Sequence, residues 1–393
     1  AKTTWGPIDQ ESRGGGCNAC HLKYSPEALA ALQAYVPAIP ERSDGGARVP
    51  PPPSGKPFPR VHPRLSVHAN GQHCFGCHSR SSRISTSYEG WHEMRHDPDE
   101  AALKAQADRF RLLQDGRTFE RKSADLHHSA GLECIDCHTA LEVMGSGHTV
   151  ASKAQALRVR CEDCHAAPGG KLASRDAKDI DPESRKILAL RGWKLVPGQR
   201  VGATRSGDTL LGVTVDAAGR GTLRRRGDGG LAPMKPQVAA CSGDIAHQRL
   251  SCNSCHTPWT PMCTSCHTRF DHLARRFVPG EWMEDSSHFD AGPPALGVRR
   301  ADGRGERGGE TVDTFVPGMI MTLDRNLKAG ASPDLVFRRL FAPTAAHTTQ
   351  RAARACTACH NDPVALGYGQ GVLRFEPGPM QPAGHSGRWR FTP

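Results

Sequence analysis

One five-residue pattern, Cys-x-x-Cys-His, constrains every fold that this sequence can adopt. It occurs seven times in 393 residues, as CNACH (17–21), CFGCH (74–78), CIDCH (134–138), CEDCH (161–165), CNSCH (252–256), CTSCH (263–267) and CTACH (356–360). These copies use every cysteine except Cys241. The chain must therefore build seven similar sites and hold them in place with the protein between them.

The chemistry of the pattern is specific because histidine follows the second cysteine in every copy. Cys-x-x-Cys-His is the attachment signature of c-type haem. Two thiols three positions apart reach the two vinyl groups of one porphyrin edge, and the histidine becomes the proximal iron ligand. A zinc half-site, a thioredoxin-like redox pair or a disulfide scaffold does not require that histidine or this constant spacing. The repetition favours covalent haem.

The pattern predicts seven covalently bound haem c groups. The predicted thioether residues are Cys17, Cys20, Cys74, Cys77, Cys134, Cys137, Cys161, Cys164, Cys252, Cys255, Cys263, Cys266, Cys356 and Cys359. The predicted proximal iron ligands are His21, His78, His138, His165, His256, His267 and His360. The fifth and sixth motifs start only eleven residues apart, so we expect their haems to be near neighbours.

The chain also carries enough histidine to supply a second, distal ligand to every iron. Twenty histidines are present and seven belong to the motifs. Bis-histidine ligation gives low potentials and closes the iron to substrates. From their positions near the motifs, we predict as distal ligands His68, His92, His127, His148, His247, His272 and His347. The reserves are His62, His73, His96, His128, His288 and His385.

Methionine and the extra cysteine are the other possible sulfur ligands. Met262, Met319 and Met321 are expected to be packing residues. For Cys241 three roles stay open: a buried free thiol, an intermolecular disulfide, or a thiolate ligand that would mark a catalytic haem.

Composition fits a chain that packs on haem. Hydrophobic residues make up 37% and aromatic residues 6% of the sequence, which is little for a conventional core of this size, and porphyrin plates would supply the missing apolar surface. The 42 glycines and 30 prolines indicate many loops and turns. We predict a loop-rich, mainly α protein of the multihaem cytochrome c class, with short helices around covalently bound haems and a small antiparallel β insertion.

Local signals place these elements. A Ser or Asp followed by Pro predicts helices over 25–35, 97–116, 181–192 and 332–343. Short β-type runs divided by turns predict two or three antiparallel strands within 193–228. Residues 50–59 are expected to form an extended polyproline spacer.

The spacing of the motifs suggests five regions along the chain. They are a four-haem region (1–170), the haem-free β insertion (171–240), a two-haem segment (241–275), a haem-free mixed region (276–345) and a one-haem segment (346–393).

Charge and hydropathy limit the partners and the cellular location that we expect for the protein. The net charge of +11 is offset in part by haem propionates, and the scattered basic residues lack stacking aromatics, so we expect no nucleic-acid partner. The sequence has no apolar run of about 18 residues, so we expect no membrane span. Haem is attached outside the cytoplasmic membrane, which predicts an exported protein in the periplasm or outside the cell, with its signal peptide removed.

Four segments, 76–93, 126–148, 247–267 and 354–369, resemble the large multihaem c-type cytochromes of environmental bacteria. This resemblance implies periplasmic or extracellular electron transfer rather than one reaction. It implies redox protein partners: other multihaem cytochromes, a membrane complex, or further copies of this chain in a larger conduit. The alternative is a multihaem oxidoreductase that acts on a small nitrogen or sulfur compound at one open or Cys-ligated haem.

Overall fold

The structure of the chain is a computed structural model. It describes residues 17–35, 60–78, 84–94, 98–106, 108–112, 118–150, 153–241, 247–261, 268–271, 276–279, 294–299, 310–324, 330, 332, 334–366, 368, 371–381 and 384–392. The predicted spacer at 50–59, the sixth motif, and His96, His272 and His288 lie outside the described residues.

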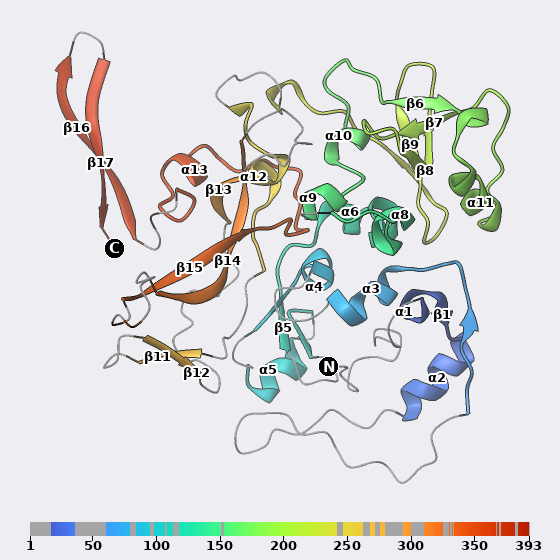
Figure 1. The fold of residues 1–393 in the computed structure, drawn as a ribbon, viewed down its shortest axis with the longest axis horizontal. Coiled ribbons are helices and arrows are strands. Elements are labelled where there is room, and N and C mark those ends of the chain that lie inside the picture. The colour runs from blue at the N-terminus through green and yellow to red at the C-terminus, as the bar shows by residue number, and fades with distance from the viewer. Residues whose placement is uncertain are drawn as a thin grey trace.

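The helices are short, and most of them carry or flank a motif (Figure 1). They are α1 (Asn18–His21), α2 (Pro26–Tyr35), α3 (Gly71–His78), α4 (Ile84–Tyr88), α5 (Glu100–Ala105), α6 (Leu126–Ser129), α7 (Cys134–Cys137), α8 (Ala140–Met144), α9 (Lys153–Ala156), α10 (Cys161–Cys164), α11 (Pro182–Leu190), α12 (Cys252–His256) and α13 (Thr357–His360), with 3-10 turns η1 (Ala177–Asp179) and η2 (Ala239–Cys241).

The strands form several separate antiparallel sheets. The largest has the order β10 (Leu231–Pro233), β9 (Gly221–Arg224), β8 (Thr209–Val215), β7 (Arg200–Ala203) and β6 (Ser174–Asp176). Two others have the orders β13 (Ala295–Arg299), β14 (Thr311–Asp324), β15 (Leu335–Pro343), and β3 (Trp91–Glu93), β5 (Thr118–Arg121), β4 (Phe110–Leu112). The two-stranded sheets pair β1 (Leu22–Lys23) with β2 (Arg64–Leu65), β11 (Thr268–Asp271) with β12 (Arg276–Pro279), and β16 (Val372–Gln381) with β17 (Gly384–Thr392).

The prediction of a mainly α protein is therefore wrong. The longest described helix, α2, has ten residues, whereas β14 has fourteen. Most motif helices are single turns, which are too short to be stable without tertiary contacts. The segments between motifs satisfy their backbone groups by pairing as strands, and strands therefore dominate the second half of the described chain (Figure 1).

Two of the four predicted helices are confirmed and two are wrong in part or whole. The predictions over 25–35 and 181–192 correspond to α2 and α11. The prediction over 97–116 fails after Ala105, since Phe110–Leu112 is strand β4 beside β5. Residues 332–343 form strand β15, because their Val, Phe and Leu residues favour strands and β14 offers a long antiparallel partner.

The five-stranded sheet is larger than the two or three strands expected within 193–228, because β6 joins it on one side and β10 on the other. Its β7–β8 and β8–β9 connections are tight turns. Gly207 and Gly219 adopt positive φ angles of 92° and 83° in these turns. That conformation costs glycine little, so the SGD and AAGRG stretches set the register of β8 against both neighbours.

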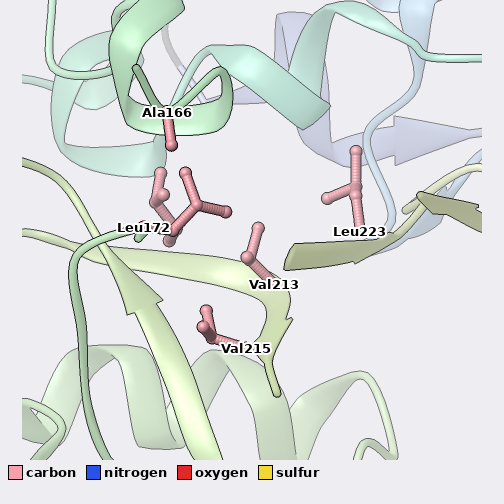
Figure 2. Close-up of a cluster of buried hydrophobic side chains, with 6 residues drawn as sticks. Ala166, Leu172, Val213, Val215 and Leu223 are labelled. Atoms are coloured by element: carbon pink, nitrogen blue, oxygen red, sulfur yellow. The ribbon is translucent and has the colours of Figure 1, made fainter. Parts of the chain in front are cut away.

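The two faces of this sheet carry two apolar cores. One is formed by Ala166, Leu172, Leu210, Val213, Val215 and Leu223. The other is formed by Ala177, Ile180, Leu188, Val201 and Leu211, with helix α11 contributing Leu188. Figure 2 shows Ala166 pointing from the end of α10 toward the side chains of the sheet. Ala166 directly follows His165, so the first core fixes the fourth motif to the sheet.

The C-terminal hairpin β16–β17 stands apart from the other described elements in Figure 1. A helix long and apolar enough to cross a membrane is absent from the described residues.

Helix α11 provides a test of the packing on the sheet. Leu188 is 4% exposed, so Leu188→Ala should lower the free energy of unfolding by about 2–5 kcal/mol, through lost burial and the cavity that remains. Val196 is 62% exposed, and Val196→Ala should change it by less than about 0.5 kcal/mol. Chemical denaturation followed by circular dichroism measures both. Equal effects of the two substitutions would contradict the packing of α11.

Candidate functional site

Each of the six described motifs folds as a short helical segment. In four of them the histidine N–H donates to the carbonyl of the first cysteine over 2.8–2.9 Å, in the motifs that begin at Cys17, Cys134, Cys161 and Cys356. Residues three apart lie on one face of a helix, so the two cysteines of a motif are presented together. The cysteines whose side chains are described form no disulfides with one another.

Four motif histidines are held through Nδ1, the ring nitrogen nearer the backbone. The Nδ1 atoms of His21, His165 and His256 lie 2.9, 2.7 and 3.0 Å from the carbonyl oxygens of Ser66, Lys235 and Gln350, and that of His138 lies 2.6 Å from Oε1 of Glu142. A histidine that binds metal through Nε2 is usually oriented by such a bond. The arrangement fits a proximal ligand.

Three motif histidines lie next to the ring of another histidine, at different mutual tilts. The ring centres are 6.0 Å apart for His165 and His127, 6.0 Å for His138 and His347, and 6.2 Å for His360 and His247. Two metal–nitrogen bonds of about 2 Å, plus roughly 1.1 Å from each nitrogen to its ring centre, place two axial imidazoles about 6 Å apart. The spacing therefore fits one iron between each pair.

The partners cross between motifs. His127 lies shortly before the third motif but faces His165 of the fourth. His347 lies shortly before the seventh motif but faces His138 of the third. His247 precedes the fifth motif but faces the seventh. Each histidine pair thus joins segments that are far apart in the sequence.

His347 has an unusual backbone. Its φ angle is 55°, the only positive value at a described residue other than glycine. Its Nδ1 lies 2.7 Å from the carbonyl oxygen of Ala345, which fixes the ring. Such conformations are uncommon and persist where the surroundings impose them, often at functional sites. The strain at His347 is consistent with a ring that must face His138.

A buried carboxylate, that of Asp125, links two of these histidine segments. It is 2% exposed, and its Oδ1 accepts hydrogen bonds from the His127 N–H at 2.8 Å and from His127 Nδ1 at 2.9 Å. Its Oδ2 accepts the Thr349 N–H at 2.6 Å, two residues after His347. Burial alone would raise the pKa of Asp125, but these hydrogen bonds outweigh it and hold the pKa below its usual value.

The described motifs form one continuous series through the molecule. The Cys74 thiol lies beside Cys134 and near Cys20, and helix α3 contacts both α1 and α7, which joins the first three motifs. Cys137 lies close enough to Cys164 for the two thiols to interact, which places the third motif beside the fourth.

The second half of the series continues from the fourth motif. Cys252 Sγ lies 3.9 Å from a carboxylate oxygen of Glu162, and Cys359 lies near Cys255. The fourth motif therefore leads to the fifth and then to the seventh. Helices α10, α12 and α13 follow one another across Figure 1 in this order.

Other predicted distal histidines do not face a motif histidine in the described structure. His68 and His148 are exposed, and the ring of His92 lies edge-on to Trp259 at 6.1 Å. Among the reserves, His128 packs edge-on against Tyr88. His73 forms hydrogen bonds through both ring nitrogens, and His62 is exposed. His385 lies on β17, but its side chain is outside the description, as are those of Met262, Met319, Met321 and Cys77.

Cys241 ends the turn η2 and is exposed. Burial raises the pKa of the Cys255 thiol, and the neighbouring Cys359, Cys252 and Cys241 add smaller contributions in that order, so Cys241 lies near the fifth motif. His256, in the same fifth motif, has no second histidine opposite it among the described residues. The structure thus places the one extra cysteine near the fifth motif, whose histidine has no histidine opposite it within the part of the chain that the structure describes.

Sequence reasoning missed the carboxylates that support the histidines. Glu142 follows His138 by four residues on a helix-forming stretch, a spacing that could have been recognised. Asp125 has no such signal, since its role depends on Thr349. No cluster of three or more His, Cys, Asp and Glu side chains converges as a metal cage within the described ranges, where the histidines meet as pairs.

No known protein family, curated protein or solved structure matches this chain.

The Asp125 carboxylate predicts a dependence of stability on pH. Because its folded pKa is lowered, it stabilises the fold above its unfolded pKa of about 3.9, and this contribution is lost as pH falls through the folded value. Asp125→Asn should therefore lower the free energy of unfolding at neutral pH by about 1–3 kcal/mol. It should also make the loss of stability at acid pH less steep. Denaturation midpoints between about pH 2 and 7 measure this. An unchanged loss of stability at acid pH would contradict it.

Proposed function

We propose that the protein is a seven-haem c-type cytochrome that conducts electrons between redox partners. The observation that carries the proposal is the meeting of three motif histidines with second histidines at ring-centre distances of 6.0–6.2 Å. The helical motif turns and the Nδ1 hydrogen bonds support it. When bound, haem would supply one-electron chemistry, and the paired histidines would hold its iron and keep it closed to substrates.

The residues of this chain would do three things for such a conductor. The paired cysteines would anchor each porphyrin edge, and the histidine pairs would hold the iron from both faces. The contacts between successive motifs, from Cys20 and Cys74 through to Cys359, would keep neighbouring centres close. The proximity of redox centres is what rapid electron transfer needs, so the continuous series supports conduction along the molecule.

The proposal also covers the cellular location of the protein and its redox partners. Covalent haem attachment implies an exported protein, in the periplasm or outside the cell. Other multihaem cytochromes, a membrane complex or further copies of this chain would then exchange electrons with it. The first and seventh motifs end the described series and are the natural points of exchange.

The fifth motif favours a second candidate, a multihaem oxidoreductase acting on a small nitrogen or sulfur compound. Its histidine lacks a described histidine partner, and Cys241 lies beside the motif. A thiolate ligand or an open iron there would create a catalytic position.

Low-temperature electron paramagnetic resonance of the oxidised protein, with a haem count per chain, tests both candidates. Seven haems that are all low-spin with bis-histidine character are expected for the conductor. A high-spin or thiolate-ligated haem would favour the oxidoreductase. A chain purified from a haem-attaching host without covalent haem would contradict both.

Adjacent histidines supply a matched pair of variants. His127 faces His165, whereas its neighbour His128 packs against Tyr88. His127→Ala should therefore turn one of the seven irons high-spin, and His128→Ala should leave the spectrum unchanged. Electron paramagnetic resonance reports the spin states. Identical spectra for the two variants would rule out His127 as a ligand.

The carboxylate of Glu142 should lower the reduction potential of one haem. Its hydrogen bond to His138 Nδ1, at 2.6 Å, makes the imidazole a stronger electron donor and so favours the oxidised iron. Glu142→Gln should raise one reduction potential by on the order of 60 mV, the equivalent of a tenfold change for one electron. Spectroelectrochemical titration measures the shift, with Glu183→Gln, an exposed glutamate on α11, as the matched control. A titration identical to that of the unmodified protein would refute this role.

A further inference from the structure

Two of the seven motifs carry aspartate directly before the second cysteine, in CIDCH and CEDCH. Asp136 is 8% exposed and Asp163 is 5% exposed. Neither is required by the attachment chemistry, because the other motifs have Ala, Gly or Ser at this position. Burying two carboxylates in equivalent places calls for a structural reason, since unpaired buried charge is costly.

The two carboxylates make the same pair of hydrogen bonds. Oδ2 of each accepts the backbone N–H of the residue before its own motif, at 2.8 Å from Glu133 and from Arg160. In this bond, a side chain in the first turn of the motif helix accepts the backbone N–H of the N-cap residue.

The other oxygen of each carboxylate reaches the five-stranded sheet. Oδ1 of Asp136 accepts the Arg226 N–H at 2.8 Å, in the connection from β9 to β10. Oδ1 of Asp163 accepts the Arg205 N–H at 2.8 Å, in the turn from β7 to β8. Backbone N–H groups in two turns of one sheet thus bind the carboxylates of two successive motifs.

Further bonds at the same interface reinforce this arrangement. Lys235, just after β10, accepts the Nδ1 bond of His165, and Gln237 Nε2 donates to the His165 carbonyl at 2.8 Å. Arg158 pairs with Asp208, near the start of β8, at 2.6 Å. The first apolar core adds Ala166. The fourth motif is therefore held by residues at the β7–β8 turn and by residues just after β10.

The fifth motif has an analogous anchor on another sheet. Ser254, before the second cysteine of CNSCH, is 1% exposed and donates its hydroxyl to the Val312 carbonyl on β14 at 2.8 Å. The position before the second cysteine is thus a contact to a β-sheet in three consecutive motifs.

We propose that Asp136 and Asp163 are positioning residues, and that the five-stranded sheet is a rigid platform that fixes the third and fourth haems relative to each other. The proposal rests on the haem assignment made above. The sheet carries no motif of its own, and its two turns are held in register by β8 and its neighbours. A fixed spacing and orientation of the two centres is what the platform would supply to electron transfer.

The β7–β8 turn allows a test that leaves the motif untouched. Gly207 N–H donates to the Thr204 carbonyl at 2.9 Å, so Arg205 is the second residue of a four-residue turn. Proline is favoured at that position and lacks an N–H. Arg205→Pro should therefore delete the bond to Asp163 with little change in the turn, whereas Arg205→Ala keeps the N–H and loses only an exposed side chain.

Two measurements on the full chain separate the outcomes. Hydrogen exchange at the amides of Cys164 and His165 should rise about five- to tenfold in Arg205→Pro, the effect of one lost hydrogen bond, and stay unchanged in Arg205→Ala. Electron paramagnetic resonance should show one altered low-spin signal in Arg205→Pro, with the haem count unchanged. Asp163→Asn should act in the same direction, and Asp216→Asn, an exposed acid that also accepts a backbone N–H in a turn, should do neither.

Each outcome decides a separate point. Equal exchange in Arg205→Pro and Arg205→Ala would overturn the anchoring role, whether or not haem is bound. Faster exchange with unaltered spectra would overturn the positioning of haem. Absence of haem from the unmodified protein would overturn the function proposed above, and the exchange result would still decide the anchor.

Discussion

The buried carboxylate of Asp125 is the interaction on which the centre of the molecule depends. One oxygen holds the His127 segment and the other holds the backbone beside His347, so a single side chain fixes the two histidines that face the fourth and third motifs. The same region is held by the Leu126 N–H, which donates to the Thr349 carbonyl at 2.8 Å, and by the side-chain amide of Gln350, which donates to the Ala124 carbonyl. Removing the carboxylate would leave several buried N–H groups without an acceptor.

Around this centre, the described chain has little conventional core. Its two larger apolar clusters both belong to the five-stranded sheet, and a third is limited to Phe75 and Phe119 with Trp91 beside them. The motif helices lie between such small cores and are held mainly by polar bonds. This division fits a protein in which haem would provide much of the buried apolar surface, and in which the sheets provide rigidity.

The helices α2 and α11 could be predicted from the sequence, because their Ser-Pro and Asp-Pro starts are local signals. The motif histidines stay a prediction as proximal ligands, which their Nδ1 hydrogen bonds support. The prediction of a helix over residues 332–343 was wrong. The same Ser-Pro start precedes a strand there, because pairing with a long partner strand decides the conformation. His127, His247 and His347 were chosen as ligands for their nearness in sequence to a motif, yet each faces a different motif. Nearness in sequence carries no information about such crossings, and Asp125 could be recognised only from the fold.

The crossing of His347 to His138 has a consequence for how the protein is made. These residues are separated by more than half of the chain, so the third motif would acquire its second histidine only after most of the polypeptide had been made. Contacts of such separation form late, because the loop between them must be closed first. The third site would therefore stay half-built and reactive until the C-terminal third of the chain had been made, and its closure would be a late step of maturation.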